Sequence, residues 1–341
     1  MTPHPPFPSP VRGRLAPSPT GKLHLGNAYA FLAAWLRARS QAGALVLRME
    51  DIDPERSRAA FAGGILEDLA WLGLDWDEGP DKGGAHGPYV QSERLERYAF
   101  WLQEFRRRGL VYPCYCTRKE LRSLASAPHV GDEGAPYPGT CRLLDAAGCE
   151  AHEREGRRAS IRMDIGAALR ALGEGDAASP LVFQDAVLGR QAVSPLQWGG
   201  DFALRRSDGV IAYQLAVAVD DADMGISEVV RGGDLLASTP RQILLFRLIG
   251  AVPPAYAHLP LLHDASGERL AKRHKSLEIG ELRAKGVPAE AVVGFLGFLA
   301  GWLDSPRALR PKELLGCFSL NTLAGRHLIL PENPLRVLCG M

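Results

Sequence analysis

Two stretches in which strand-like and helix-like patterns alternate constrain the fold of this chain more than any other feature. The first runs from residue 11 to about 109, where short apolar runs at 11–16 and 44–49 alternate with helical patterns. The helical patterns cover residues 27–39, 58–72 and 92–108. Such alternation predicts a parallel sheet covered by helices.

A segment of different character separates the two stretches. Between residue 110 and about 205 the chain is rich in turns, Cys, Gly and Pro, with short strand candidates at 159–163, 181–185 and 202–204. Alternation then resumes with apolar runs at 211–219 and 226–230 and a helix from about 239 to 249. The sequence therefore predicts an α/β domain that is split by an insertion.

We expect five segments along the chain. From residue 277 onward the pattern is helical, with Pro288 well placed for a helix start before an apolar run at 292–302. The expected segments are a disordered N-terminal tail (1–10), the first half of the α/β domain (11–110), the insertion (111–205), the second half (206–250), and a Lys-containing loop with a short helical C-terminal region (251–341).

Composition excludes several classes of protein. The formal net charge of +1 over 341 residues argues against a protein that coats nucleic acid non-specifically, although the basic clusters at 106–108 and 272–275 could still grip phosphates. The proline-rich start has no secretory signal pattern, and no stretch approaches membrane-spanning length. We therefore expect a cytoplasmic protein with no membrane partner. Six unevenly spaced cysteines indicate metal binding or buried thiols rather than disulfides.

The first chemical motif is RLAPSPTGKLHLGN at residues 14–27, which passes from a strand pattern through a Pro- and Gly-rich turn into a helix start. His24 and the backbone amides near Gly26 and Asn27 would then lie at a helix N-terminus, where phosphate can bind. For HLGN alone, an ordinary strand-to-helix turn is the better explanation, because four-residue matches are common by chance.

The second motif is RLAKR at residues 269–273, which follows a glycine-containing loop. It supplies Lys272 and Arg273, positive charges suited to the pyrophosphate that leaves when ATP is attacked. On its own a charge run is more often a solvated face. A register on Lys275 and Ser276 is an alternative.

Together the two motifs resemble those of class I aminoacyl-tRNA synthetases, and the string from Arg14 to Gly21 resembles the glutamate and glutamine branch. The resemblance implies a Rossmann-like catalytic domain in which His24 and Lys272 are catalytic. Departures occur at Arg269 and Ala271, where the family expects Lys and Ser. The implied ATP-binding residues are His24, Gly26, Asn27 and Lys272.

An amino acid pocket for glutamate needs a cation for a carboxylate, and arginine is preferred because its planar fork binds carboxylates through two hydrogen bonds. Arg14, Glu50 and Arg231 lie at or just after strand-like runs, where parallel sheets place ligand-binding groups. Val217 stands where discriminating relatives tend to have Asn, from which we expect a lower affinity for the substrate. By resemblance, the glutamate-binding residues are Arg14, Ala16, Ser18, Glu50, Tyr213 and Arg231.

Three cysteines, Cys114, Cys116 and Cys141, cluster in the turn-rich insertion and could bind one tetrahedral zinc ion. Ligand softness would favour Cys149 or His129 as the fourth ligand. The resemblance instead implies Tyr137, in a Cys-x-Cys, Tyr-x-x-x-Cys set. We expect a structural Zn²⁺, one per chain; buried thiols without metal are the alternative. Cys149, Cys317 and Cys339 have no assigned partner.

The length of chain beyond the second motif narrows the resemblance. Only 68 residues follow Arg273, so we expect no anticodon-binding domain. The chain most closely resembles the family of glutamyl-queuosine tRNA(Asp) synthetases, truncated paralogues of glutamyl-tRNA synthetases. This resemblance implies a ligase that activates L-glutamate with ATP and Mg²⁺ and transfers it to queuosine in the anticodon of tRNA(Asp). A truncated synthetase that charges a tRNA 3′ end, a non-catalytic glutamate or adenylate sensor, and a zinc-dependent nucleic-acid-binding module are the alternatives.

Overall fold

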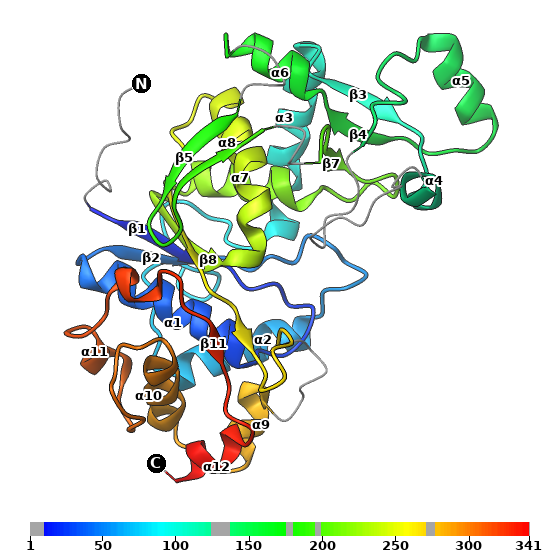
Figure 1. The fold of residues 1–341 in the computed structure, drawn as a ribbon. Helices are drawn as coiled ribbons and strands as arrows, with labels where there is room; N and C mark the ends of the chain where they lie inside the picture. The colour runs from blue at the N-terminus through cyan, green and yellow to red at the C-terminus, as the bar shows by residue number, and fades with distance from the viewer. Residues whose placement is uncertain (1–9, 124–136, 175–179, 195–198, 271–276, 341) are drawn as a thin grey trace.

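The computed structural model describes residues 10–123, 137–174, 180–194, 199–270 and 277–340 (Figure 1). The expected disordered tail falls on residues 1–10, of which 1–9 lie outside the described residues, as does Lys272. No helix among the described residues is both long and apolar enough to cross a membrane.

A parallel sheet forms the centre of the molecule, as the alternating pattern predicts. In spatial order the strands are β2 (Ala44–Leu47), β1 (Arg12–Leu15), β8 (Glu228–Gly232), β9 (Ala255–Leu259), β5 (Leu181–Asp185) and β6 (Gly189–Val193). Strands β1 and β2 pair in parallel, and the amide of Ser227 donates to the carbonyl of Arg12 (2.9 Å), which places β1 beside the start of β8. Strands β8 and β9 and strands β5 and β9 are also parallel, whereas β6 pairs antiparallel with β5.

Helices cover this sheet, and most of them match the predicted ranges. They are α1 (Leu25–Ser40), α2 (Ala59–Trp71), α3 (Leu95–Arg107), α7 (Tyr213–Asp223) and α8 (Thr239–Leu248). The apolar run at 211–219 lies mostly in helix α7, whose residues 214–221 are all buried. A helix that is buried on every side has no polar face, so its sequence lacks the period that would separate it from a buried strand.

The insertion forms a second, antiparallel sheet made of β3 (Val111–Cys114), β4 (Ser160–Met163) and β7 (Ala203–Arg205). Helices α4 (Arg118–Ser123), α5 (Ala146–Arg154) and α6 (Ile165–Ala171) accompany it. Strands β5 and β6 fall inside the range predicted as insertion but belong to the central sheet, where Asp185 pairs with Tyr256. The predicted insertion is therefore not one continuous unit, because β5 and β6, which lie in the sequence between β4 and β7 of the second sheet, join the central sheet.

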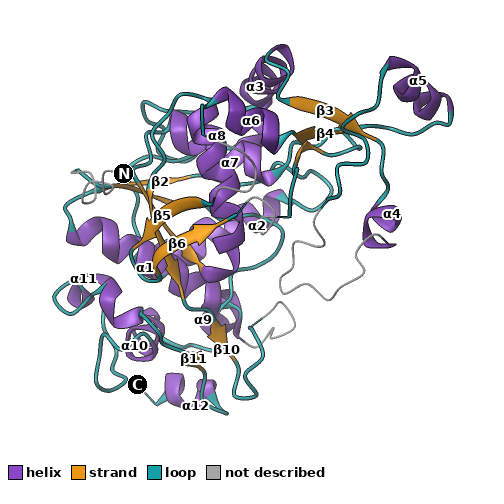
Figure 2. Ribbon diagram, turned by 45° about the horizontal axis from the view of Figure 1, so that its top comes forward, coloured by secondary structure: helices purple, strands orange, loops and turns teal. Residues whose placement is uncertain are grey.

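The C-terminal region packs against the opposite side of the molecule from the insertion, as Figures 1 and 2 show for α10 and α11 relative to α4 and α5. Its elements are β10 (Leu262–His263), α9 (Ile279–Ala284), α10 (Ala289–Leu299), α11 (Pro311–Leu314), β11 (Leu328–Ile329) and α12 (Pro334–Cys339). Pro288 caps α10 as predicted.

Two features of this region depart from a purely helical extension. Strand β9 continues the central sheet past residue 250, and β11 returns to pair in parallel with β10. The ring of Trp302 stacks on Tyr29 of α1 with a centroid distance of 6.3 Å, so the end of the chain shares a hydrophobic core with the first helix. Burying large side chains of this kind contributes about 1.5–3 kcal/mol each.

Candidate active site

The two motifs meet at one cavity of about 420 Å³ beside the carboxyl ends of β1 and β8, which we call the central cavity. His24 forms an isolated β-bridge with Glu278, and the amide of Ile279 donates to the carbonyl of Leu23 at 2.8 Å. Arg269 and Leu270 line the cavity together with residues of the first motif. The chain on both sides of Lys272 is thus held next to His24.

His24 is the N-cap of helix α1, and its hydrogen bonds fix how the ring can act. Its Nδ1 atom accepts from the amides of Gly26 (3.0 Å) and Asn27 (3.4 Å), and the Asn27 side chain accepts from the His24 amide at 3.2 Å. A neutral ring that accepts at Nδ1 holds its proton on Nε2. The backbone amides of Gly26 and Asn27, which we expected to bind phosphate, instead donate to His24. The group of this motif that can donate to phosphate is therefore Nε2 of the imidazole.

Gly26 lets the ring take this position. A Cβ atom at residue 26 would lie 2.9 Å from Cε1 and 3.0 Å from Nδ1 of His24, closer than van der Waals contact allows. The glycine of the motif therefore makes room for the imidazole that lies over it.

All six predicted glutamate-binding residues line the central cavity, together with His24, Gly26 and Asn27. They come from separate elements: Arg14 from β1, Glu50 from the loop after β2, Tyr213 from the start of α7 and Arg231 from β8. Because carboxyl ends of parallel strands meet at one edge of a sheet, residues far apart in the sequence are brought together here. Val217 is buried one turn after Tyr213 and is not among the described residues that line the cavity.

Arg14 and Arg231 hold buried N–H groups that no residue of the described chain accepts from. Both residues are almost fully buried, with 6% and 4% of their surfaces exposed. Nε of Arg14 and Nη1 of Arg231 have no hydrogen-bond partner in the described part of the chain, although Asp221 Oδ2 lies 3.5 Å from the Arg14 nitrogen. Buried charged donors are normally satisfied. Two unsatisfied guanidinium donors in one cavity therefore indicate a site for an anion such as a carboxylate.

Glu50 supplies the opposite charge and belongs to a buried ion-pair network that the sequence did not reveal. Arg48, which has no exposed surface, donates to Glu50 (3.0 Å) and to Asp221 (2.7 Å), and its Nε atom lies 3.6 Å from Asp220. Burial raises the pKa of the Glu50 carboxyl more than Arg48 and Arg14 lower it. The network joins the loop after β2 to helix α7, which begins with Tyr213.

Arg231 also has contacts that the sequence did not predict. Its Nη2 atom donates to Thr239 Oγ1 at 2.7 Å, and its Nε atom donates to His258 Nε2 at 3.2 Å. His258 in turn contacts Asp185. A single buried histidine or aspartate in an apolar strand gives little sequence signal, because such residues usually serve only the core.

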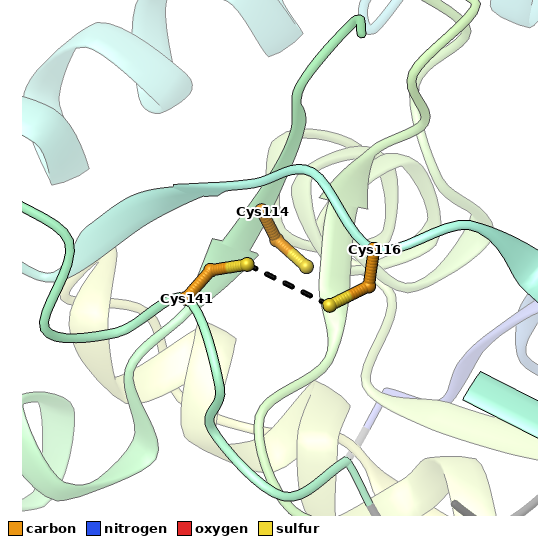
Figure 3. Close-up of side chains that lie close together, drawn as sticks. All are labelled: Cys114, Cys116 and Cys141. Carbon is orange, nitrogen blue, oxygen red and sulfur yellow. Dashed lines mark hydrogen bonds between the residues drawn. The ribbon is translucent and has the colours of Figure 1, made fainter. Parts of the chain in front are cut away.

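The three predicted cysteines of the insertion lie together. Their sulfur atoms all lie within 4.8 Å of one another, a spacing from which one metal ion could be bound (Figure 3). Cys116 and Cys141 are 3.6 Å apart. Two thiolates on a tetrahedral zinc ion are separated by roughly 3.8 Å, so this distance fits. Within the described part of the chain, Cys149 is not a member of this group, and His129 lies outside that part.

Tyr137 touches the same cluster. Its hydroxyl oxygen lies 3.2 Å from Sγ of Cys114 and 3.9 Å from Sγ of Cys116, and it accepts from the Cys141 amide at 2.9 Å. The spacing expected between an oxygen and a sulfur ligand of one zinc ion is roughly 3.6 Å. The hydroxyl is therefore placed where a fourth ligand could be.

Comparisons with known proteins agree with this geometry. A family model described as "tRNA synthetases class I (E and Q), catalytic domain" matches residues 10–314. The chain is 57% identical over 325 residues to a protein of Nitratidesulfovibrio vulgaris named "Glutamyl-Q tRNA(Asp) synthetase", covering 95% of this chain and 96% of that protein. A protein of the same name from Symbiobacterium thermophilum is 49% identical, with coverage of 96% and 98%.

Longer relatives match as well. "Glutamate--tRNA ligase 2" of Syntrophus aciditrophicus is 40% identical, and the match covers 95% of this chain but 64% of that protein. A crystal structure of a glutamate tRNA ligase from Elizabethkingia meningosepticum in complex with its amino acid superposes with a TM-score of 0.77 at 26% identity, covering 95% of this chain and 68% of that one. The chain belongs to the class I tRNA synthetases of the glutamate and glutamine group, and it contains their Rossmann-like catalytic domain.

Proposed function

We propose that this chain is a glutamyl-Q tRNA(Asp) synthetase, a ligase that activates L-glutamate with ATP and transfers it to queuosine in the anticodon of tRNA(Asp). The observation that supports it most is the central cavity, where two partly unsatisfied arginines lie beside the motif residues His24 and Arg269. The two relatives with this name share more sequence with the chain than the glutamate–tRNA ligase cited above.

In the first step the α-carboxylate of glutamate attacks the α-phosphorus of ATP. A bond from the carboxylate oxygen to phosphorus forms, the bond to the bridging oxygen of the β-phosphate breaks, and pyrophosphate leaves. His24 donates from Nε2 to the phosphate oxygens, and Lys272 neutralises the charge on the departing pyrophosphate. Mg²⁺ arrives with ATP and supplies further neutralisation of the phosphates.

Glutamate itself is held by other residues of the central cavity. Arg14 and Arg231 offer the N–H groups that no described residue accepts from to its side-chain carboxylate, and Glu50 accepts from its ammonium group. Ala16, Ser18 and Tyr213 line the same cavity.

In the second step a hydroxyl of the queuosine ring attacks the carbonyl carbon of glutamyl-adenylate. An ester bond forms, AMP leaves, and the hydroxyl proton passes to the leaving phosphate or to water. The mixed anhydride is already activated, so positioning of the anticodon loop supplies most of the rate. We expect the insertion and the basic clusters at 106–108 and 272–275 to bind that loop.

The thiol cluster binds a structural Zn²⁺ in this proposal. Cys114, Cys116 and Cys141 would supply three ligands and Tyr137 the fourth, which fills the coordination shell with protein atoms. The ion would hold the end of β3 against the turn that contains Cys141. No catalytic step passes through it.

The decisive experiment measures incorporation of labelled glutamate into tRNA from a bacterium that makes queuosine and from one that does not, with purified protein and ATP. We expect incorporation only into the queuosine-containing tRNA. Equal incorporation into both, with the product protecting the terminal ribose from periodate, would establish 3′-end charging instead. Absence of glutamate-dependent pyrophosphate exchange would favour a sensor. ATP and tRNA are cytoplasmic substrates, so we place the activity in the cytoplasm.

A further inference from the structure

We propose that Asp185 and His258 form a buried pair that positions Arg231 for the carboxylate of the substrate. The inference deepens the proposed function, because it assumes that Arg231 binds glutamate. Asp185 and His258 do not line the central cavity where it is described, so they act through Arg231 and are positioning residues.

Three neighbouring strands bring the residues of this pair and Arg231 into line. Arg231 on β8 is paired in register with His258 on β9, and Asp185 ends the next strand, β5. Asp185 Oδ2 lies 2.6 Å from His258 Nδ1, and His258 Nε2 lies 3.2 Å from Arg231 Nε. The exposed fractions of Asp185 and His258 are 1% and 0%. The contact chain therefore runs inside the sheet, without access to solvent.

The proton positions along this chain follow from one fact, that a guanidinium N–H can only donate. Since Arg231 Nε donates to His258 Nε2, that ring nitrogen is unprotonated, and the proton is on Nδ1. Nδ1–H then donates to Asp185. Asp185 is itself fixed by the amides of Val187 (2.9 Å) and Leu188 (2.8 Å), so the orientation of the ring is anchored to the backbone of the turn between β5 and β6.

The hydrogen bonds of Arg231 determine which of its nitrogen atoms is left for a ligand. His258 occupies Nε, and Thr239 occupies Nη2 at 2.7 Å. Nη1 is the buried nitrogen of Arg231 for which no described residue serves as hydrogen-bond partner, and Arg231 lines the central cavity. A change at His258 would remove the acceptor that holds Nε and leave only contacts to Nη2, from Thr239 and the Leu235 carbonyl, so Nη1 would be held less firmly in one direction.

The electrostatic surroundings keep His258 in the form that accepts from Arg231. Burial lowers the pKa of His258, and the charges of Arg231 on β8 and Arg14 on β1 lower it further, against the opposing effect of Asp185 on β5. Tyr256, on the same strand as His258, stacks on its ring at a centroid distance of 5.9 Å. The ring is therefore neutral at physiological pH. Burial alone would raise the pKa of Asp185, but hydrogen bonds from His258 and the two amides lower it.

A merely structural pair would affect stability but not substrate affinity, and this difference gives the test. Steady-state pyrophosphate exchange is measured for wild-type protein and variants, with separate KM values for glutamate and ATP. For His258→Leu we expect the KM for glutamate to rise about 10- to 100-fold, the effect of losing a hydrogen bond to a charged group, with the KM for ATP changed less than about twofold. His258→Gln, which keeps an acceptor, should recover most of the loss.

Asp185→Asn provides a second variant that preserves shape. An asparagine amide can donate to Nδ1, which would move the histidine proton to Nε2. Two N–H donors, His258 Nε2 and Arg231 Nε, would then face each other and could not form a hydrogen bond. We expect a rise of at least about tenfold in the KM for glutamate. Leu181→Val, four residues before Asp185 on the same strand, changes buried packing without touching the pair, and should leave both KM values within about twofold.

Failure of the inference and failure of the proposed function give different results. If wild-type protein shows no glutamate-dependent exchange, the proposed function is wrong and the inference falls with it. If wild-type protein is active but His258→Leu and Asp185→Asn lower only the thermal midpoint, while the KM for glutamate stays within about twofold, the pair is structural and the inference is wrong.

Discussion

The residues of the central cavity lie far apart in the sequence, for example Arg14 on β1 and Arg231 on β8. The residues of the thiol cluster come from one stretch, between Cys114 and Cys141. The cavity residues are held by the buried sheet and by ion pairs that surround Arg48. The thiol cluster belongs to a small satellite core with few buried apolar residues. The residues of the central cavity are therefore held by the fold itself, whereas we expect the part of the fold around the thiol cluster to depend on a bound metal ion.

Removing the charge of Arg231 should impair the central cavity more than any other change considered. Arg231→Ala should lower kcat/KM for glutamate in pyrophosphate exchange by at least about 100-fold, because a buried carboxylate would lose its cation. Circular dichroism should remain that of the folded protein. Arg190→Ala, an exposed arginine on β6 of the same sheet, is the matched control and should be fully active. Equal activity of the two variants would show that Arg231 does not bind the substrate.

A substitution in the thiol cluster tests whether the two sites are independent of each other. Cys141→Ser should release the metal ion and loosen the insertion, lowering glutamate transfer to tRNA by about 10-fold or more. Glutamate-dependent pyrophosphate exchange should remain within about threefold of wild type, because the central cavity has its own support. Metal content by mass spectrometry accompanies the assays.

Cys149→Ser is the matched control for this experiment, since Cys149 does not belong to the described cluster. It should keep one zinc ion per chain and full transfer activity. If Cys141→Ser lowered pyrophosphate exchange as much as transfer, the two sites would not be independent, and the comparison above would be wrong.

Sequence patterns identified residues that line the central cavity, but not the buried residues that hold them in place. Strand-and-loop motifs place His24 and Arg14 by local rules, because a cap residue or a strand end is defined by its neighbours in the chain. The sequence pattern places β5 in the insertion because its partner β9 follows some seventy residues later, and pairing over such a distance leaves no local mark. The same reason hid Asp185 and His258, whose partners lie on other strands.

A smaller effect is expected at the helix start beside the cavity. Gly26→Ala would place a methyl group 2.9 Å from His24 Cε1, so the ring must move and its Nε2 donor with it. We expect kcat for adenylate formation to fall about tenfold, with the KM for glutamate little changed, because the donor acts on the phosphates. Single-turnover pyrophosphate release measures this.

Gly64→Ala is the matched control, because a Cβ at Gly64 in helix α2 would meet no described atom within 4 Å. That variant should keep full kcat and gain about 0.5–1 kcal/mol of stability from helix propensity. A Gly26→Ala protein that kept wild-type kcat would show that the ring position is not critical.

The smallest expected effect concerns a buried charge outside both sites. Asp68 on α2 is 4% exposed, its Oδ1 has no hydrogen-bond partner within the described chain, and Arg283 of α9 lies 3.5 Å away. Burial raises its pKa to about 6, with the charge of Arg283 opposing the rise. Because the folded state binds the proton more tightly than the unfolded state, stability from this group is present below about pH 4 and is lost as the pH rises through 6.

Asp68→Asn should therefore increase the free energy of unfolding by about 1–2 kcal/mol at pH 8 and by much less at pH 4.5, as measured by urea denaturation. Activity should not change, because Asp68 is not among the described residues of the central cavity. Glu67→Gln, an exposed neighbour on the same helix, should shift stability by less than about 0.5 kcal/mol at either pH. If Asp68→Asn stabilised the protein equally at both pH values, the gain would come from packing and not from removal of the buried charge. Asp68 would then not differ in its electrostatics from the carboxylates that pair with Arg48.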